Sequence, residues 1–301
     1  MQKRLLICLL LVLFAASCGT SHDADDGTVQ VFPDNPRTEF GGERPVTLQV
    51  PTTYDSSKPL PLVIILHGYS ANGFIQQAYL RLSNLAETQT VLVIAPDGTF
   101  DSSGNRFWNA TDVCCNDPSH SVDDVAYIRG LITDIRHDYN VDAKRIYLIG
   151  HSNGGFMAHR LACDAASEVA AIVSLAGATY TDASKCKPSQ PVSILDIHGD
   201  RDDTIAYDGG GFRGSMYPSE QVTMEHWQVY DRCQPGLALD SMRLDLELTI
   251  IGPETDVQRF NGCARATGVE LWSIRGGGHI PTLTRYFPTL VWQWLKDHPK
   301  Q

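Results

Sequence analysis

Ser152 lies at the centre of Gly150-His151-Ser152-Asn153-Gly154, with a glycine two positions before it and two positions after it. The apolar run 145–149 before this motif predicts a β-strand, and the run 156–163 after it predicts a helix. Glycine is needed where a tight, strained turn leaves no room for a Cβ, and such a turn exposes the serine hydroxyl for nucleophilic attack. We therefore expect Ser152 to be a nucleophile, and a chance match in a glycine-rich turn is the alternative.

A serine hydroxyl becomes a good nucleophile when a histidine removes its proton and a carboxylate orients that histidine. His279 follows three consecutive glycines after the last expected strand, so its loop can reach back over the sheet. The loop 198–205 leaves the carboxyl end of another expected strand, where ligands gather in open α/β sheets. It offers three carboxylates, which are Asp200, Asp202 and Asp203. His151 and His198 are interpreted as packing residues.

Negative charge that develops on a carbonyl oxygen during acyl transfer needs two N–H donors, which together form an oxyanion hole. The backbone N–H of Asn153, directly after the serine, is the first expected donor. The backbone N–H of Tyr69 is the second, because His67-Gly68-Tyr69-Ser70 follows the apolar strand 62–66. An ordinary strand-ending turn is the alternative interpretation of this second segment.

These residues must be positioned by alternating strands and helices. Strands are expected at 45–51, 62–66, 91–95, 145–149, 170–176, 192–197 and 269–274, and helices at 74–88, 122–139, 156–163, 218–232 and 288–298. The first strand alternates and is expected to be antiparallel, whereas the later ones are apolar runs typical of strands covered on both faces. The alternation predicts an α/β fold with a mostly parallel central sheet flanked by helices. The segment 99–121 is expected to be a long functional loop.

The N-terminus has the pattern of a targeting segment. Residues 1–17 combine a positive start with an apolar run too short to span a bilayer, as in a lipoprotein-type signal peptide. Small residues directly before Cys18 resemble a bacterial lipobox, so we expect lipidation of Cys18; a plain secretory signal is the alternative. Residues 18–40 are expected to be a tether and 41–301 one catalytic domain. The protein would then be extracytoplasmic, secreted or lipid-anchored to a bacterial cell envelope.

Six cysteines remain after Cys8 and Cys18 are set aside, and an even number in an exported chain indicates disulfides. The preferred pairs bracket elements that should be neighbours, namely Cys163–Cys186 and Cys233–Cys263. This leaves Cys114–Cys115 as a vicinal pair. A zinc site is the competing interpretation, but the chain has no C-x-x-C or H-x-x-x-H spacing, and we expect no metal.

Taken together, the motifs resemble the polyhydroxybutyrate depolymerase and feruloyl esterase family, which is carbohydrate esterase family one within the α/β-hydrolases. The resemblance extends from about Arg44 to the C-terminus. It rests on the segments 66–68, 122–125, 150–155, 198–202 with Tyr207 and 209–210, and 276–279. The family's H-G-x-x-D turn implies that Asp202 is the acid partner of His279, with Asp200 and Asp203 as turn residues. The aspartates of Val122-Asp123-Asp124-Val125 are expected to cap a helix N-terminus.

One departure from the family concerns the substrate. Many members carry a tryptophan shortly after the histidine, whereas Ile280-Pro281-Thr282 stands here. Trp108, in the long loop, is a candidate for lining the substrate pocket instead, and a core position is the alternative. No linker or surface-binding module is visible, which disfavours an insoluble polyester as substrate.

The expected activity is that of a serine carboxylic-ester hydrolase acting through an acyl-enzyme without a cofactor. The substrate would be a small-molecule or oligosaccharide ester, such as a feruloyl or acetyl ester of plant polysaccharide or a short hydroxyalkanoate ester. A serine peptidase of the same fold and a non-catalytic, surface-anchored binding protein are the alternatives. The formal net charge of −11 argues against nucleic acid as a partner. We expect a monomer that contacts membrane through its lipid anchor alone.

Overall fold

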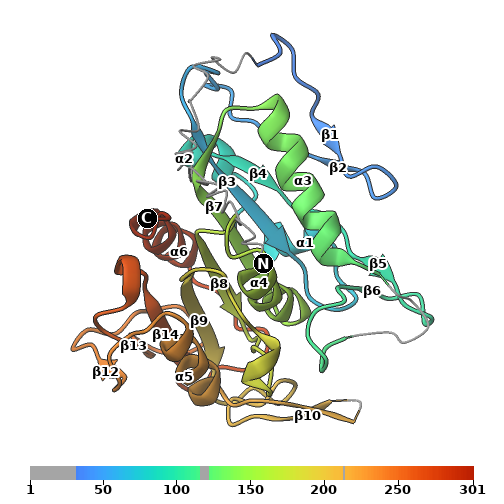
Figure 1. The fold of residues 1–301 in the computed structure, drawn as a ribbon. Coiled ribbons are helices and arrows are strands. Elements are labelled where there is room, and N and C mark those ends of the chain that lie inside the picture. The colour runs from blue at the N-terminus through green and yellow to red at the C-terminus, as the bar shows by residue number, and fades with distance from the viewer. Residues whose placement is uncertain (1–31, 116–121, 213) are drawn as a thin grey trace, which may run out of the picture. The chain divides into compact units, whose positions relative to one another are not determined.

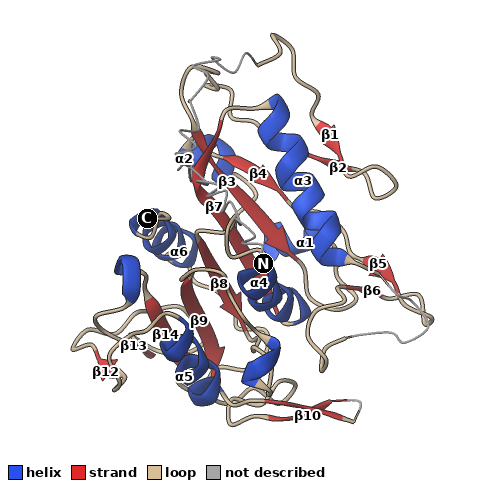
Figure 2. Ribbon diagram, viewed as in Figure 1, coloured by secondary structure: helices blue, strands red, loops and turns tan. Residues whose placement is uncertain are grey.

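The computed structural model of the protein describes residues 32–115, 122–212 and 214–301, and Figures 1 and 2 show its ribbon. The expected signal peptide, the possible lipidation at Cys18 and most of the expected tether fall outside these described residues. The description below concerns the unit that begins at Phe32 and ends at Gln301.

A mostly parallel sheet, with eight strands in the described ranges of the chain, forms the centre of this unit. Its strands are β3 (Leu60–Leu66), β4 (Leu92–Ile94), β7 (Val141–His151), β8 (Ala171–Leu175), β9 (Ser193–Gly199), β12 (Ala238–Leu239), β13 (Thr255–Arg259) and β14 (Val269–Ile274). Their spatial order is β12-β13-β14-β9-β8-β7-β3-β4. The strands from β14 to β4 run parallel, and β12 and β13 add an antiparallel edge.

Among the described residues, three short antiparallel pairs lie outside the central sheet. They are β1 (Glu39–Phe40) with β2 (Val46–Thr47), β5 (Thr99–Phe100) with β6 (Arg106–Phe107), and β10 (Gly210–Phe212) with β11 (Ser215–Tyr217). The expected first strand, 45–51, is therefore reduced to β2, although Gln49 also makes an antiparallel bridge to Val93 of β4. The expected long loop after β4 begins with the β5–β6 hairpin.

Helices cover both faces of the central sheet. They are α1 (Gly73–Tyr79), α2 (Leu85–Gln89), α3 (Asp124–Asp138), α4 (Asn153–Asp164), α5 (Glu220–Tyr230) and α6 (Phe287–Asp297), with 3₁₀ turns at Ala183–Lys185 and Ala264–Ala266. Alternate residues of β3 enter different cores: Leu62, Ile64 and Leu66 pack with α3, α4 and α5, which lie in front of the sheet in Figure 1. Val63 and Ile65 pack with residues 80–86 and with α6 on the other face. This alternation explains why each parallel strand is a continuous apolar run.

The helix predicted over 74–88 is two helices, and the prediction of one helix was wrong. α1 ends because Arg81 adopts a left-handed backbone conformation with φ 58°. The N–H of Arg81 donates to the carbonyl of Ala78 at 3.1 Å, and the N–H of Leu82 donates to that of Gln77 at 2.9 Å. This is the Schellman arrangement, which satisfies the last carbonyls of a helix and turns the chain away.

Disulfides join segments on the α4 and α5 side of the sheet. Cys163 of α4 is bonded to Cys186, which follows the first 3₁₀ turn. Cys233, just after α5, is bonded to Cys263, and the adjacent Cys114 and Cys115 are bonded to each other. Within the described part of the chain, no helix has both the length and the apolarity needed to cross a membrane.

Candidate active site

The turn between β7 and α4 holds Ser152 in a strained conformation, with φ 53° and ψ −121°. Its N–H donates to the carbonyl of Leu175 on the neighbouring strand β8 at 2.8 Å. A Cβ at Gly150 would lie 2.1 Å from the carbonyl oxygen of Gly154, and one at Gly154 would lie 2.2 Å from that of Leu66. Because neither contact is possible for real atoms, both glycines are required for this turn.

Ser152, His279 and Asp202 form one hydrogen-bonded line. Nε2 of His279 lies 3.0 Å from Oγ of Ser152, and Nδ1 lies 2.7 Å from Oδ2 of Asp202. Oδ1 of Asp202 accepts the backbone N–H groups of Thr204 and Ile205, both at 2.8 Å. With a proton on Nδ1 facing the carboxylate, Nε2 has a lone pair directed at the serine hydroxyl. The arrangement can therefore transfer a proton from Oγ to the imidazole.

Asp202 is held as a carboxylate. Burial on its own would raise the pKa of this group, but hydrogen bonds from His198, His279 and the backbone of Ile205 outweigh burial and lower the pKa well below its ordinary value. Its side chain has no exposed area, whereas that of His279 is 12% exposed. The negative charge therefore stays next to the imidazole, and the imidazole itself is open to a substrate.

The loops that carry Asp202 and His279 are joined by several contacts. The N–H of Gly276 donates to Oδ1 of Asp200 at 2.6 Å, and the N–H of Arg201 donates to the carbonyl of Gly277 at 2.9 Å. Of the three carboxylates in the loop 198–205, Asp202 contacts the imidazole of His279 and Asp200 connects this loop to the one that carries His279.

His151 supports His279 from the elbow, which is the turn at residues 150–154 between β7 and α4. Nε2 of His151 lies 2.9 Å from the carbonyl oxygen of His279, and its ring centroid is 5.1 Å from that of His279 and 5.2 Å from that of Tyr79. Burial, and then the charge of His279, lower the pKa of His151 to about 4. His151 is therefore neutral and donates through Nε2. It packs as the sequence suggested, and it also fixes the backbone at His279.

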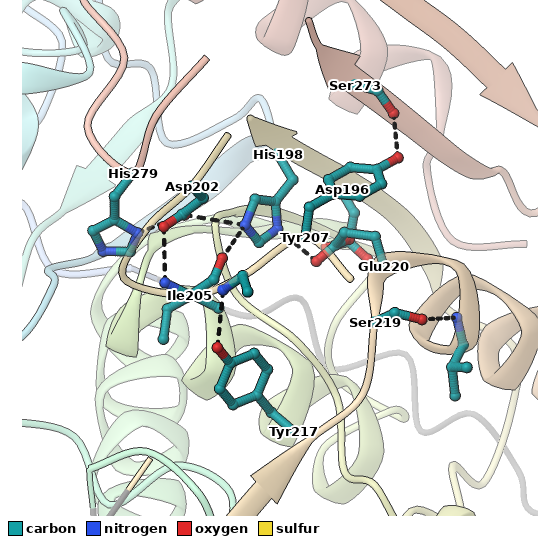
Figure 3. Close-up of polar contacts among 12 residues, drawn as sticks. Asp196, His198, Asp202, Ile205, Tyr207, Tyr217, Ser219, Glu220, Ser273 and His279 are labelled. Carbon is teal, nitrogen blue, oxygen red and sulfur yellow. Dashed lines mark hydrogen bonds and ion pairs between the residues drawn. The ribbon is translucent and has the colours of Figure 1, made fainter. Parts of the chain in front are cut away.

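The interpretation of His198 as a packing residue was incomplete, because its ring also bonds two carboxylates. Its Nδ1 lies 2.6 Å from Oε1 of Glu220, and its Nε2 lies 3.1 Å from Oδ2 of Asp202 and 2.8 Å from the carbonyl oxygen of Ile205 (Figure 3). Burial opposes its charge, but the carboxylates of Glu220 and Asp202 prevail and raise the pKa of His198 to about 10.

The segment expected to supply the second oxyanion donor lies against the elbow. A Cβ on Gly68 would be 3.5 Å from Cβ of Ser152, so the residue before Tyr69 lies close to Ser152. His67 fixes this segment: its Nε2 accepts the N–H of Gly98 at 2.8 Å, and its Nδ1 donates to the carbonyl of Gly68 at 2.7 Å. Burial lowers the pKa of His67, so its ring stays neutral, with the proton on Nδ1.

Trp108 does not line a pocket. Its side chain is 0% exposed, so the alternative interpretation, a core position, describes it. Its indole N–H donates to the carbonyl of His67 at 3.0 Å, and its backbone N–H and carbonyl bond the Asn153 side chain at 2.6 and 2.9 Å. Trp108 thus connects the elbow to the His67 segment. The backbone N–H of Asn153, at the first residue of α4, has no acceptor within the helix.

The two aspartates at the start of α3, Asp123 and Asp124, have different roles. Asp123 caps the helix, because its side chain accepts the N–H of Ala126 at 2.9 Å. Asp124 is fully buried, pairs with Arg44 at 2.6 Å and accepts the N–H of Asn109 at 2.7 Å. Asp124 therefore fixes the loop that begins after Trp108, a role that the capping prediction did not include.

Two apolar side chains are exposed on the segments that lie around His279. Ile280, the next residue in the chain after His279, is 67% exposed, and Ile75 of α1 is 53% exposed. α1 is tied to this loop because the hydroxyl of Tyr79 donates to the carbonyl of Pro281 at 3.0 Å. Among the described residues, no group of three or more His, Cys, Asp or Glu is arranged to hold a metal ion.

A mostly parallel sheet with helices on both faces, and a serine at the turn after β7, define the α/β-hydrolase fold, as the sequence predicted. The sequence profile of the putative esterase family matches residues 38–251, and the chain belongs to this family.

Individual relatives of the chain are also named as esterases. The chain is 26% identical to feruloyl esterase B of Piromyces equi over 78% of its own length and 42% of that protein. It is 27% identical to a bifunctional acetylxylan esterase/xylanase of Neocallimastix patriciarum, over 87% of its own length and 35% of that protein. The chain thus spans less than half of these two longer relatives. Acetyl xylan esterase from Aspergillus awamori superposes with a TM-score of 0.57 at 15% identity, covering 89% of this chain and 97% of that one, which shows a common fold.

Proposed function

We propose that the protein is a serine carboxylic-ester hydrolase that works through an acyl-enzyme. The observation that carries this proposal is the line from Oγ of Ser152 to Nε2 of His279 at 3.0 Å, continued from Nδ1 to Asp202 at 2.7 Å. A nucleophile, a base and a group that orients the base are the parts that acyl transfer requires.

In the first half of the reaction, Oγ of Ser152 bonds to the ester carbonyl carbon while its proton moves to Nε2 of His279. The carbonyl electron pair moves onto the oxygen, and the N–H groups of Asn153 and Tyr69 stabilise the resulting oxyanion. When the tetrahedral intermediate collapses, the bond to the leaving alkoxy oxygen breaks and that oxygen takes the proton from Nε2. The products are an alcohol and an acyl group on Ser152.

In the second half, water attacks the acyl carbon and gives its proton to Nε2 of His279. Collapse then breaks the bond to Oγ, which recovers the proton, and the carboxylic acid leaves. Throughout both halves Asp202 stays ionised and stabilises the imidazolium, since its pKa is held low.

For the substrate, we favour feruloyl or acetyl esters of plant polysaccharide. The names of the two relatives, feruloyl esterase and acetylxylan esterase, support this class. Ile280, directly after His279, and Ile75 on α1, which is bonded to the same loop through Tyr79, are exposed and offer apolar surface to an acyl group. Short hydroxyalkanoate esters remain the second class to test, in a panel of methyl ferulate, acetylated xylan and a hydroxybutyrate oligomer.

Replacing the nucleophile tests the mechanism. Ser152→Ala is expected to lower kcat for a short p-nitrophenyl ester by a factor on the order of a million, the scale of triad deletions. Initial rates of the purified variant and of the wild-type protein provide the measurement. A wild-type rate in the variant would remove Ser152 as the nucleophile. Peptide substrates assayed in parallel distinguish an esterase from a serine peptidase, and an inactive wild-type protein would favour the binding-protein alternative.

The cellular location is also a proposal. The disulfides Cys114–Cys115, Cys163–Cys186 and Cys233–Cys263 fit an exported protein. We propose export through the segment 1–17 with a lipid on Cys18, and metabolic labelling with a fatty-acid analogue, compared between wild type and Cys18→Ala, tests it.

A further inference from the structure

The hydrogen-bonded line of the active site continues past Asp202 into the protein interior (Figure 3). His198, at the end of β9, bonds Asp202 on one side and Glu220, the first residue of α5, on the other. The relative exposure of His198 is 0% and that of Glu220 is 2%, so neither group reaches solvent. Burying two ionisable groups is costly, and a chain retains such a pair most readily when each satisfies the other.

The partners of His198 determine where its protons are. Nε2 faces the carboxylate of Asp202 and the carbonyl of Ile205, both of which only accept, so Nε2 carries a proton. Nδ1 faces Oε1 of Glu220 at 2.6 Å. A ring with oxygen acceptors at both nitrogens is best satisfied as an imidazolium, with Glu220 as its counter-ion.

Other ionisable groups surround the pair on each packed element. Burial has the largest effect on Glu220 and raises its pKa; His198 opposes this effect, Asp196 of β9 adds to it, and the net shift is upward. Asp196 has its own partner, His159 of α4, at 3.0 Å. The Tyr207 ring packs edge-on to His198, with centroids 5.7 Å apart, and its hydroxyl bonds that of Ser273. On the active-site side the facing groups are Asp202, His279 and His151.

We infer that His198 and Glu220 are positioning residues of the active site, which hold Asp202 as a fixed and ionised acceptor for His279. The inference rests on the proposed function, because it assigns the pair a task within that reaction. Oδ2 of Asp202 receives both imidazoles, from His279 at 2.7 Å and from His198 at 3.1 Å.

This arrangement has a direct consequence for proton transfer. When Ser152 gives its proton to His279, the new imidazolium could pass its other proton to Asp202. The positive charge of His198 on the same carboxylate oxygen makes Asp202 a weaker base and opposes that transfer. His198 also anchors Ile205, whose N–H is itself a donor to Asp202, so it fixes the orientation of the carboxylate.

Two substitutions at one position test the inference. His198→Gln places an amide nitrogen near the site of Nε2 and keeps a donor to Asp202, whereas His198→Asn places its amide near Nδ1 and leaves Asp202 without this donor. His198→Asn is expected to lower kcat by about 10- to 100-fold, the scale of a small misplacement of catalytic groups, with KM unchanged because His198 lies away from the substrate. His198→Gln is expected to recover most of that loss.

The pH profile separates a positioning role from a merely structural one. Without the His198 charge, Asp202 attracts the proton on His279 more strongly, so the acid limb of kcat/KM is expected to move to higher pH in both variants. Glu220→Gln should produce the same direction of shift with a smaller loss of kcat, because His198 loses its counter-ion but keeps its place. Folded variants with a wild-type kcat and acid limb would overturn the inference.

Nitrogen-15 NMR of the wild-type histidines gives a readout that needs no ester hydrolysis. Both ring nitrogens of His198 are expected to be protonated at neutral pH, and in Glu220→Gln the ring should titrate at lower pH. A neutral His198 in the wild-type protein would overturn the inference even if the His198 variants do not fold. A wild-type protein that does not hydrolyse esters would instead refute the proposed function. The failure of the inference and the failure of the proposed function are therefore distinguishable.

Discussion

Ser152 shows how strain at one residue is maintained by its neighbours. Its φ of 53° lies in a region that residues with side chains seldom occupy, at a cost on the order of 1–3 kcal/mol. The glycines around it let β3, β7 and α4 approach closely enough to hold that conformation. Asn153 adds two side-chain hydrogen bonds to the backbone of the fully buried Trp108. The position of the Ser152 hydroxyl therefore depends on buried contacts around it.

Asn153→Ala tests this dependence. The substitution leaves the buried N–H of Trp108 without its partner, and an unpaired buried group costs about 1–3 kcal/mol; the carbonyl of Trp108 keeps the N–H of Ala110 at 2.9 Å. We expect a lower urea midpoint with an unchanged m-value, measured by far-ultraviolet circular dichroism. The backbone N–H at position 153 remains, so folded protein should retain activity. A midpoint equal to that of the wild type would show that these bonds do not support the turn.

At the scale of elements, the sequence predicted the parts that depend on local patterns. Apolar runs identified the parallel strands, and the G-x-S-x-G motif with the glycine run before His279 identified the segments that meet in the site. The helix 74–88 was predicted whole because its apolar spacing continues through Arg81, whose left-handed conformation does not show in that spacing. β13 was missed because it lies next to the edge strand β12 and its sequence is mostly polar.

Contacts between distant elements were harder to predict. Glu220 looks like an ordinary acidic residue in the first turn of a helix, and its pairing with His198 depends on where α5 packs against β9. The apolar strand directly before His198 was a signal of burial, but nothing local indicated a carboxylate partner. For Trp108 the sequence likewise allowed either a pocket or a core position, and in the structure its side chain is buried in the core.

The Cys163–Cys186 disulfide connects α4, which follows Ser152, to the segment before β9, the strand that leads into the loop with Asp202. Its closed loop spans a sequence separation of 23 residues, for which chain entropy suggests a stabilisation of roughly 3 kcal/mol. We expect the double variant Cys163→Ser, Cys186→Ser to have a lower Tm in calorimetry, by several degrees. The same shift should appear in the wild type on reduction of this bond. An unchanged Tm would assign the bond no role in stability.

At the scale of the whole molecule, buried acids make stability depend on pH. Burial raises the pKa of Asp231, at the end of α5, from 3.8 to about 7. The folded state therefore holds a proton that the unfolded chain releases at lower pH. The contribution of Asp231 to the free energy of unfolding is greatest below about pH 4, decreases as the pH rises towards 7, and is constant above that pH.

Asp231→Asn removes this ionisation. Its free energy of unfolding relative to wild type is expected to increase between pH 4 and pH 7, by roughly 1 to 4 kcal/mol in total. Urea denaturation of both proteins across this range gives the measurement. The new amide also changes one buried hydrogen bond, which shifts the free energy of unfolding of the variant by the same amount at every pH. The test is therefore the direction in which the difference between the two proteins changes with pH. A difference that is independent of pH would contradict a neutral, buried Asp231.

The central claim is that three segments far apart in the chain make the hydroxyl of Ser152 uniquely reactive. A fluorophosphonate probe followed by peptide mapping in a mass spectrometer tests it most directly. The account predicts one adduct per chain, on the peptide that contains Ser152, with none in Ser152→Ala and much slower labelling in His279→Ala. An adduct on another residue, or no adduct in wild-type protein that hydrolyses esters, would contradict it.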